Sequence, residues 1–327
     1  MYSQLLAKIR EILHKDVDER EVNMENYHAI APVNFHDKRC CFVDGGNSLL
    51  FDAPHIAIGI IRTASITFFK EKKEINRKES FCVFERNDNK IIATLISDDE
   101  AYCNEIYEFD TNKKDENFEE CLTIIMRTKE WDLALNKLTL SKNINNNNNN
   151  NTSSNNTNSQ NINYLFLDGT FDSPDQFMKE KKEYFFKKVK ELKIPTAGIA
   201  KTNTLLLKNS SYTYAVNKHS SKSIWFYPIN EEKYIAKFHP SSSYIFVLEG
   251  INIDESVFGI LQSWSKDPAV LGYPYGLIFA DQIARITNEE KTILTTKLSV
   301  MLKEDYNKLS HFAKNKDLHL VLDHLQY

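Results

Sequence analysis

The chain has 327 residues, of which 42% are apolar and 26% charged, the composition of an ordinary water-soluble globular protein. Its formal net charge is −4, so it lacks the overall basic charge of proteins that coat nucleic acid, although its 41 lysines and arginines leave room for a local basic groove. None of its five cysteines forms a C-x-x-C pair and no run approaches the roughly 18 apolar residues of a membrane span, so we expect reduced thiols, no membrane contact and a cytoplasmic location (nuclear in a eukaryote).

Hydrophobic periodicity predicts the elements of the first half of the chain. An apolar stripe over residues 3–15 has helical spacing and internal charges, which indicates an amphipathic helix rather than a signal peptide. Strands are expected up to Asp44, over 54–69 (as one strand or two) and in a hairpin of 81–85 with 90–96, and a second helix over 117–139.

The composition changes abruptly over residues 143–163, where 13 of 21 residues are Asn. Such a segment cannot bury enough apolar area to offset the entropy lost on ordering, so we expect a disordered surface insertion. It separates a helix from the next strand, which is typical of a lengthened loop rather than a domain boundary. The chain is therefore expected to form a single domain over 1–327.

After the Asn-rich segment, strands and helices are mixed. A strand ends at Asp168, a long amphipathic helix follows over 175–193, and a short strand over 196–202 carries Lys201 at its end. Further strands are expected near 223–226, 233–238 and 243–250, and helices over 256–264, 276–286 and 289–314. This order indicates an α/β fold around a mixed central sheet.

Two strand–Asp–Gly segments are the first candidates for chemistry: Asp44 in 41-CFVDGGNSLLF-51 and Asp168 in 164-YLFLDGTFDS-173. An acid at the end of an apolar strand, followed by Gly, is the arrangement of RNase H-like nucleases, whose neighbouring strands present carboxylates to one or two metal ions. Carboxylate oxygens suit Mn²⁺ and Mg²⁺, and two such ions can activate a water and stabilise the leaving oxygen of a phosphodiester. The glycines would leave room for a metal and a phosphate. The alternative is that both are turns, because Asp-Gly is a common turn dipeptide.

Several segments, in the same order along the chain, resemble the NurA family of DNA-repair nucleases. The last of them, with Gly272-Tyr273-Pro274-Tyr275, is the most specific. The matching segments are 43-VDGG-46 with the apolar run through 61-IRTASI-66, 127-RTKEWDLAL-135, 165-LFLDGTF-171, 198-GIAKT-202, 234-YIAKFHPSSSYIFVLE-249 and 272-GYPYGLIFADQIARIT-287.

The resemblance implies a set of site residues. The two metal-binding aspartates of the family match Asp44 and Asp168, and its glutamate, a few residues after an arginine, matches Glu130 after Arg127. Glu119 and Glu120 are alternatives that lie a turn or more too early. Where the family has a histidine in an Ala-His pair, this chain has Asp281. It either replaces the histidine as a metal ligand or marks a divergent, inactive member.

Other residues have two readings each. Lys201 is expected either to contact the scissile phosphate or to be a surface lysine at a strand end. Arg62 is expected to pair with the active-site acids, to anchor DNA, or to form a partly buried structural ion pair. His239 is expected to shape its loop before Pro240. Tyr273 and Tyr275 are expected either to stack on nucleic-acid bases or to pack at the start of a helix. The lysines of 179–193 are expected to form a solvated helix face or, alternatively, a rim that contacts DNA.

The resemblance implies a Mn²⁺- or Mg²⁺-dependent deoxyribonuclease with an RNase H-like fold. It would act as a single-strand endonuclease and 5′–3′ exonuclease in DNA end processing and repair, as a homodimer docked onto a HerA-like hexameric ATPase. Its catalytic residues would be Asp44, Glu130, Asp168 and Lys201, with Asp281 as a further metal ligand. Two alternatives remain open: a catalytically impaired NurA-like module that binds DNA or a partner, and an unrelated cytosolic α/β protein.

Overall fold

The computed structural model of the protein describes residues 2–13, 22–98, 104–110, 117–148, 161–172, 176–201, 206–207, 210–220, 222–306 and 308–309. Seven α-helices are found there: α1 Tyr2–Leu13, α2 Phe118–Asn148, α3 Gln176–Leu192, α4 Tyr212–His219, α5 Glu255–Trp264, α6 Tyr275–Ala284 and α7 Asn288–Leu302. The strands of the same part of the chain are β1 His28–Ala29, β2 Cys40–Asp52, β3 Ile56–Phe69, β4 Lys72–Asn87, β5 Lys90–Ile96, β6 Glu105–Asp110, β7 Tyr164–Asp168, β8 Thr196–Ala200, β9 Leu206–Leu207, β10 Ser210–Ser211, β11 Trp225–Pro228, β12 Lys233–Lys237 and β13 Phe246–Ile251.

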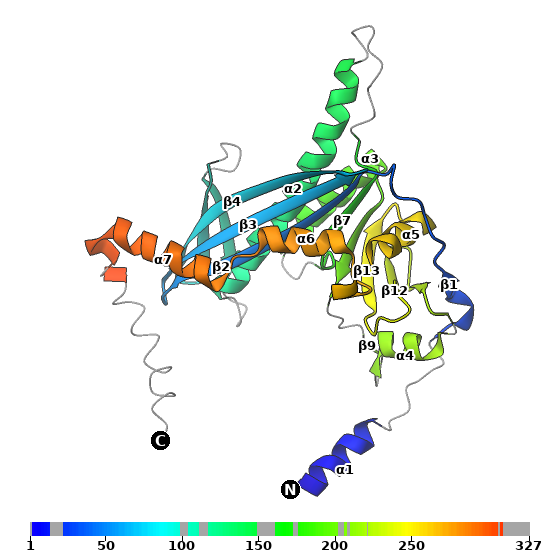
Figure 1. Ribbon diagram of the computed structural model, residues 1–327. Coiled ribbons are helices and arrows are strands. Elements are labelled where there is room, and N and C mark those ends of the chain that lie inside the picture. Colours follow the sequence, from blue (N-terminus) through cyan, green and yellow to red (C-terminus); the bar gives the residue numbers. More distant parts are fainter. Residues whose placement is uncertain are drawn as a thin grey trace.

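One 11-stranded sheet organises the described residues, with the strand order β1-β11-β12-β13-β8-β7-β2-β3-β4-β5-β6 (Figure 1). The long strands β2, β3 and β4 are antiparallel, whereas β7 runs parallel to both β2 and β8. Three antiparallel strands continued by two parallel ones form the core of an RNase H-like sheet. The predicted α/β fold class, with a mixed central sheet between helices, is confirmed.

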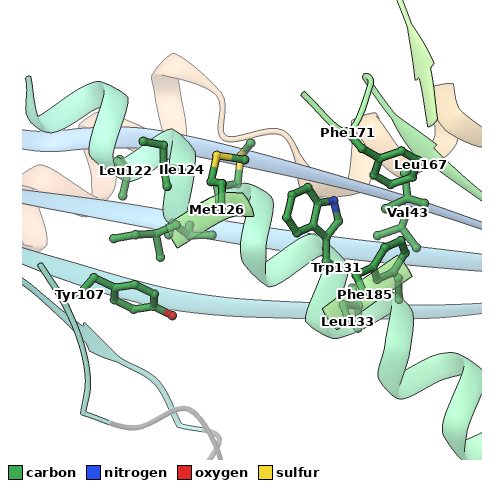
Figure 2. Close-up of a cluster of buried hydrophobic side chains, with 14 of the residues drawn as sticks. Val43, Tyr107, Leu122, Ile124, Met126, Trp131, Leu133, Leu167, Phe171 and Phe185 are labelled. Atoms are coloured by element: carbon green, nitrogen blue, oxygen red, sulfur yellow. The ribbon is translucent and has the colours of Figure 1, made fainter. Parts of the chain in front are cut away.

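Side chains that alternate along β2 and β7 pack against different helices, because successive residues of a strand point to opposite faces. Val43 and Leu167 belong to the core beneath α2 and α3, and Phe42 and Phe166 to the core beneath α5 and α6. In Figure 1, α6 lies across the near side of β2 and β3 while α2 runs behind them. Figure 2 shows the α2–α3 side, where Trp131, Phe171 and Phe185 gather beside Val43 and Leu167. The sheet is therefore covered on both faces where it crosses from β2 to β7.

Most predicted elements are present, and several differ in extent or were not predicted. The strand expected to end at Asp44 continues to Asp52, because Gly45 and Gly46 pair with Thr63 and Arg62 of β3 and keep the chain extended. Helix α4 and the strands β1, β6, β9 and β10 were not predicted, and β4 begins at Lys72 rather than near residue 81. Helix α2 continues to Asn148, and Ile162 is buried in the core. Residues 149–160, the middle of the predicted disordered insertion, lie outside the described residues.

Two expectations from composition concern the thiols and the membrane. Four cysteines, Cys40, Cys41, Cys82 and Cys121, are buried and form no disulfide within the described residues, and Cys103 lies outside them. No helix in the described part of the chain has the length and apolarity to cross a membrane.

Arg62 is a buried structural cation rather than a partner of the predicted site acids. Its side chain is 2% exposed on β3, and its guanidinium donates to Glu79 on β4 at 2.7 Å and to Glu290 near the start of α7. It also donates to the backbone carbonyl of Arg285, just after α6, at 2.6 Å. This one residue therefore ties the sheet to the chain between α6 and α7.

We predict that Arg62→Met lowers the free energy of unfolding by about 2 to 3 kcal/mol, because a buried bonding network loses its centre. The matched control is Arg77→Met. Arg77 contacts the same Glu79 but its side chain is 46% exposed, so its loss is expected to cost less than about 1 kcal/mol. Urea unfolding measures both. Equal effects of the two substitutions would contradict the structural role of Arg62.

Candidate active site

The two aspartates lie side by side where β2 and β7 part. The parallel register of these strands ends at Val43 opposite Leu167, so Asp44 and Asp168 are the next residues on each strand. Each follows an apolar run that anchors its strand between the two helical layers. Asp44 is only 3% exposed, since β2 continues past it along β3. The juxtaposition expected from the sequence is therefore present, but Asp44 lies inside a strand rather than at an exposed end.

The two glycines after Asp44 admit a helix on each face of the sheet. A Cβ on Gly45 would lie 2.5 Å from Oε1 of Glu130 and 2.9 Å from Cγ of Met126, both on α2. A Cβ on Gly46 would lie 2.4 Å from the backbone carbonyl oxygen of Ala284, at the end of α6. The expected reason for these glycines, space for a metal and a phosphate, is thus replaced by close helix approach. That approach brings Glu130 against the backbone beside Asp44.

Asp44 and Glu130 each keep one buried carboxylate oxygen without a hydrogen-bond partner. Oδ1 of Asp44 accepts from the backbone N–H of Gly45 at 2.8 Å, and Oε2 of Glu130 accepts from Arg127 at 3.2 Å. Oδ2 of Asp44 and Oε1 of Glu130 make no hydrogen bond of regular geometry, although the nearby backbone N–H of Gly45 works to lower the pKa of Glu130, which is only 1% exposed. Buried polar atoms are nearly always bonded in folded proteins, so two such oxygens indicate a missing cationic or donor ligand.

Asp168 is fully engaged instead. Its Oδ2 accepts from Nζ of Lys201 at 2.9 Å, and its Oδ1 accepts from the hydroxyl of Tyr273 at 2.7 Å. Its backbone carbonyl accepts from Arg127 at 2.5 Å. Lys201 follows β8, Tyr273 precedes α6, and Arg127 lies on α2. Three separate segments therefore orient this one aspartate.

Asp281 stands on α6 within the same charged group. Its carboxylate accepts a hydrogen bond from Arg285, one turn later, and its Oδ1 lies 3.8 Å from Nζ of Lys201. Lys201 therefore lies between Asp168 and Asp281. Both oxygens of the residue predicted to replace the family histidine face cations of this chain.

Burial and mutual repulsion raise the pKa of the two acids with unpartnered oxygens. The pKa of Asp44 lies well above its usual value, chiefly because of burial and then because of the carboxylates of Asp168 and Glu130. Burial raises the pKa of Glu130 to about 7 against the opposing effect of Arg127, while the charge of Asp168 raises it further. Burial works to lower the pKa of Lys201, but the ion pair with Asp168 outweighs it and keeps the ammonium charged.

An open cleft of about 800 Å³ leads to this group. Its lining includes Arg127, Asp168, Gly169 and Lys201, with Glu119 and Glu120 exposed on α2 at its edge. Glu119 and Glu120 are thus alternatives that the structure places on the rim, whereas Glu130 lies against Gly45. A chain of phosphates entering the cleft would meet Lys201 and Arg127 before the buried acids.

The donor chemistry fits a divalent cation at Asp44 and Glu130. Both unpartnered atoms are carboxylate oxygens, the ligands that Mn²⁺ and Mg²⁺ prefer. Among the described residues, no three His, Cys, Asp or Glu side chains already converge as a ready metal-binding group. Of the four predicted metal ligands, Asp168 and Asp281 are held by cations of the chain, which leaves Asp44 and Glu130 as the pair that fits.

The remaining candidates have structural contacts. Nδ1 of His239 accepts from the backbone N–H of Ser241 at 3.2 Å, as expected of a loop-shaping residue. Tyr275 packs on Phe279 within α6. On α3, Lys188 pairs with Glu191 and Lys190 with Glu232, both exposed pairs as expected of a solvated helix face, whereas Lys182 pairs with the buried Glu249 of β13.

Two contacts that shape the site were not predicted from the sequence. Tyr273, expected to stack on bases or to pack at a helix start, instead donates a hydrogen bond to Asp168. Arg127, which served only to locate Glu130 in the sequence, binds both Glu130 and the backbone carbonyl of Asp168. The Tyr-Pro-Tyr segment was the only pattern that pointed toward the first contact.

No family model matches the chain, and no curated protein matches it in sequence. Among solved structures, the NurA nuclease from Sulfolobus solfataricus superposes with a TM-score of 0.55 at 11% identity, over 93% of this chain and 95% of that one. A structure of NurA with manganese superposes with a TM-score of 0.50 at 10% identity, over 93% and 97%. At such identities the likeness concerns the fold. It extends over nearly the whole of each chain, and this protein has a NurA-like fold.

Proposed function

We propose that the protein is a metal-dependent nuclease that hydrolyses DNA phosphodiesters. The observation that carries the proposal is the pair of buried, unpartnered oxygens of Asp44 and Glu130 beside a cleft lined by Lys201 and Arg127. Acids that repel one another and remain buried cost stability unless a cation joins them, so their retention favours a functional cation site. The NurA-like fold, shared with nucleases, supports the same reading.

Asp44 and Glu130 would hold Mn²⁺ or Mg²⁺, and manganese is present in one of the similar NurA structures. A divalent cation there supplies Lewis acidity toward water and toward a phosphate oxygen. The chain's own residues do the positioning. Arg127 fixes Glu130 and the backbone of Asp168, and Tyr273 orients the carboxylate of Asp168.

Lys201 is the residue of this group best placed to meet the substrate. Its side chain is 46% exposed at the cleft, and its ammonium stays charged beside Asp168. A fixed cation there would offset the negative charge that develops on a phosphate during hydrolysis. The ion pair with Asp168 also fixes the position of the ammonium.

The finer parts of the proposal extend beyond this site. We propose DNA, as single strands or duplex ends, as the substrate, with a role in end processing and repair. Assembly as a homodimer with a HerA-like hexameric ATPase stays a prediction from the resemblance. It is compatible with a net charge of −4, because a motor that grips DNA relieves the nuclease of binding the backbone alone.

The first prediction from the proposal concerns cleavage. The wild type is expected to cut 5′-labelled single-stranded DNA with Mn²⁺ or Mg²⁺ and not with EDTA. Asp44→Asn is expected to reduce the rate at least about 100-fold, because the neutral amide is a poor ligand for a divalent cation. Gel electrophoresis of the labelled products measures both rates.

Glu85→Gln is the matched control, since Glu85 is an exposed acid on β4, away from the site, and its loss should leave the rate unchanged. A blunt duplex and an RNA of the same sequence, assayed in parallel, define the substrate. A folded wild type that binds DNA but cuts none of these substrates in any metal would contradict the nuclease proposal and support the impaired binding module.

The second prediction follows from the raised pKa of Glu130. The ordinary pKa of 4.5 applies to the unfolded chain, and the pKa rises to about 7 in the folded protein. The folded state then binds the extra proton, so the stability it contributes is complete below pH 4.5 and is lost as the pH rises to 7. The loss amounts to about 3 kcal/mol in the metal-free protein.

Urea unfolding in EDTA between pH 5 and 8 tests this. Glu130→Gln should abolish that part of the pH dependence and be more stable than the wild type at pH 8, and Glu85→Gln should follow the wild type. Mn²⁺ should stabilise the wild type more at pH 8 than at pH 5, because protons compete with the metal. Parallel pH profiles of wild type and Glu130→Gln would show that Glu130 ionises normally.

A further inference from the structure

The carboxylates of the candidate active site form two groups, which differ in whether their oxygens have hydrogen-bond partners. On one side, Oδ2 of Asp44 and Oε1 of Glu130 are buried and have no partner. On the other, both oxygens of Asp168 accept hydrogen bonds, one of them from Lys201. The site is therefore open to an added cation on one side only.

The Lys201 ammonium lies between the carboxylates of Asp168 and Asp281. Its Nζ lies 2.9 Å from Oδ2 of Asp168 and 3.8 Å from Oδ1 of Asp281, so it bridges two carboxylates from β7 and α6. It also lies over the ring of Tyr273, 5.4 Å from the centroid, where the π face favours a positive charge. Three contacts, one from β7 and two from α6 and the residues just before it, hold this nitrogen atom.

The charge balance points the same way. Four carboxylates face three cationic side chains, Arg127, Lys201 and Arg285, so the group has a net charge of −1 when all four acids have lost their protons, as metal binding requires. One divalent cation brings the group to +1, which suits a phosphate substrate. Two would bring it to +3 and would place like charges close together, at a cost that grows in a buried setting.

We propose that the protein binds a single divalent cation at Asp44 and Glu130, and that Lys201 serves as its built-in second cation between Asp168 and Asp281. This inference rests on the proposed function, because it assigns the cation count of that same site. It also gives Asp281 a role: the acid holds the ammonium in place rather than binding a metal. Lys201 is then a positioning and charge-compensating residue whose removal opens a second metal position.

The test is a Mn²⁺ titration of the full chain, with free Mn²⁺ followed by electron paramagnetic resonance and no substrate present. The wild type is expected to bind one ion. Lys201→Met keeps the length of the side chain and removes its charge. This variant is expected to bind a second ion, with a dissociation constant at least tenfold below that of any weak second ion on the wild type. Lys201→Arg should restore the single site, and Asp44→Asn should weaken the first ion at least tenfold.

Lys233→Met is the matched control. Lys233 pairs with Asp172 at 3.4 Å and with Glu249 at 3.9 Å, outside the four carboxylates, so its loss should leave one ion bound. Circular dichroism establishes that each variant is folded. A wild type that binds two ions of similar affinity, or a Lys201→Met protein that still binds one, overturns the inference.

The cleavage assay distinguishes a wrong inference about Lys201 from a wrong nuclease proposal. A wild type that binds two ions and cuts DNA in their presence retains the nuclease proposal and loses only the role of Lys201. A wild type that binds no Mn²⁺ and cuts nothing overturns both.

Discussion

The site depends on keeping several carboxylates together where water is largely excluded. Asp44 and Glu130 are almost fully buried, and Asp168 is the next acid along the sheet, so burial and the charge of Asp168 raise the pKa of both buried acids. Such an arrangement persists only if the surrounding fold fixes it and if cations compensate it. Arg127 and Lys201 supply part of that compensation. The remaining deficit lies at two unpartnered oxygens, and it is the reason we propose a divalent cation there.

The fold fixes these acids by bringing rigid elements together from both sides of the sheet. Parallel pairing of β2 with β7 places the aspartates side by side, and apolar residues before each one pack beneath helices on both faces. Glycines 45 and 46 then let α2 and α6 approach the sheet at the residues after Asp44. The site is therefore built from strand and helix positions rather than from loops, which suits a centre that must hold repelling charges in place.

Much of this could be predicted from the sequence, because apolar strands and amphipathic helices leave clear patterns. The order of elements follows from these patterns. The adjacency of Asp44 and Asp168 was suggested by two strand–Asp–Gly segments in an α/β chain. The continuation of β2 past Asp44 could not be predicted, since glycines usually end strands and only pairing with β3 keeps them extended here. The bond from Tyr273 to Asp168 was also out of reach, because it joins residues 105 positions apart.

The departure at Asp281 shows how a single residue changes its meaning with context. From the sequence it stands where the similar family has a histidine and suggests a substitute metal ligand. In the structure it faces Arg285 and Lys201, and it belongs to the half of the site that the chain's own cations already satisfy. A residue's role in such a cluster depends on which charges lie next to it in three dimensions, and that information is not local in the sequence.

The most direct test of the central claim is a crystal structure of the protein grown with Mn²⁺, with anomalous scattering used to locate the ion. The account predicts an anomalous peak within coordination distance of Oδ2 of Asp44 and Oε1 of Glu130, the two oxygens that now lack partners. At saturating Mn²⁺, the absence of a peak there, or a peak bound only by other residues, would contradict it.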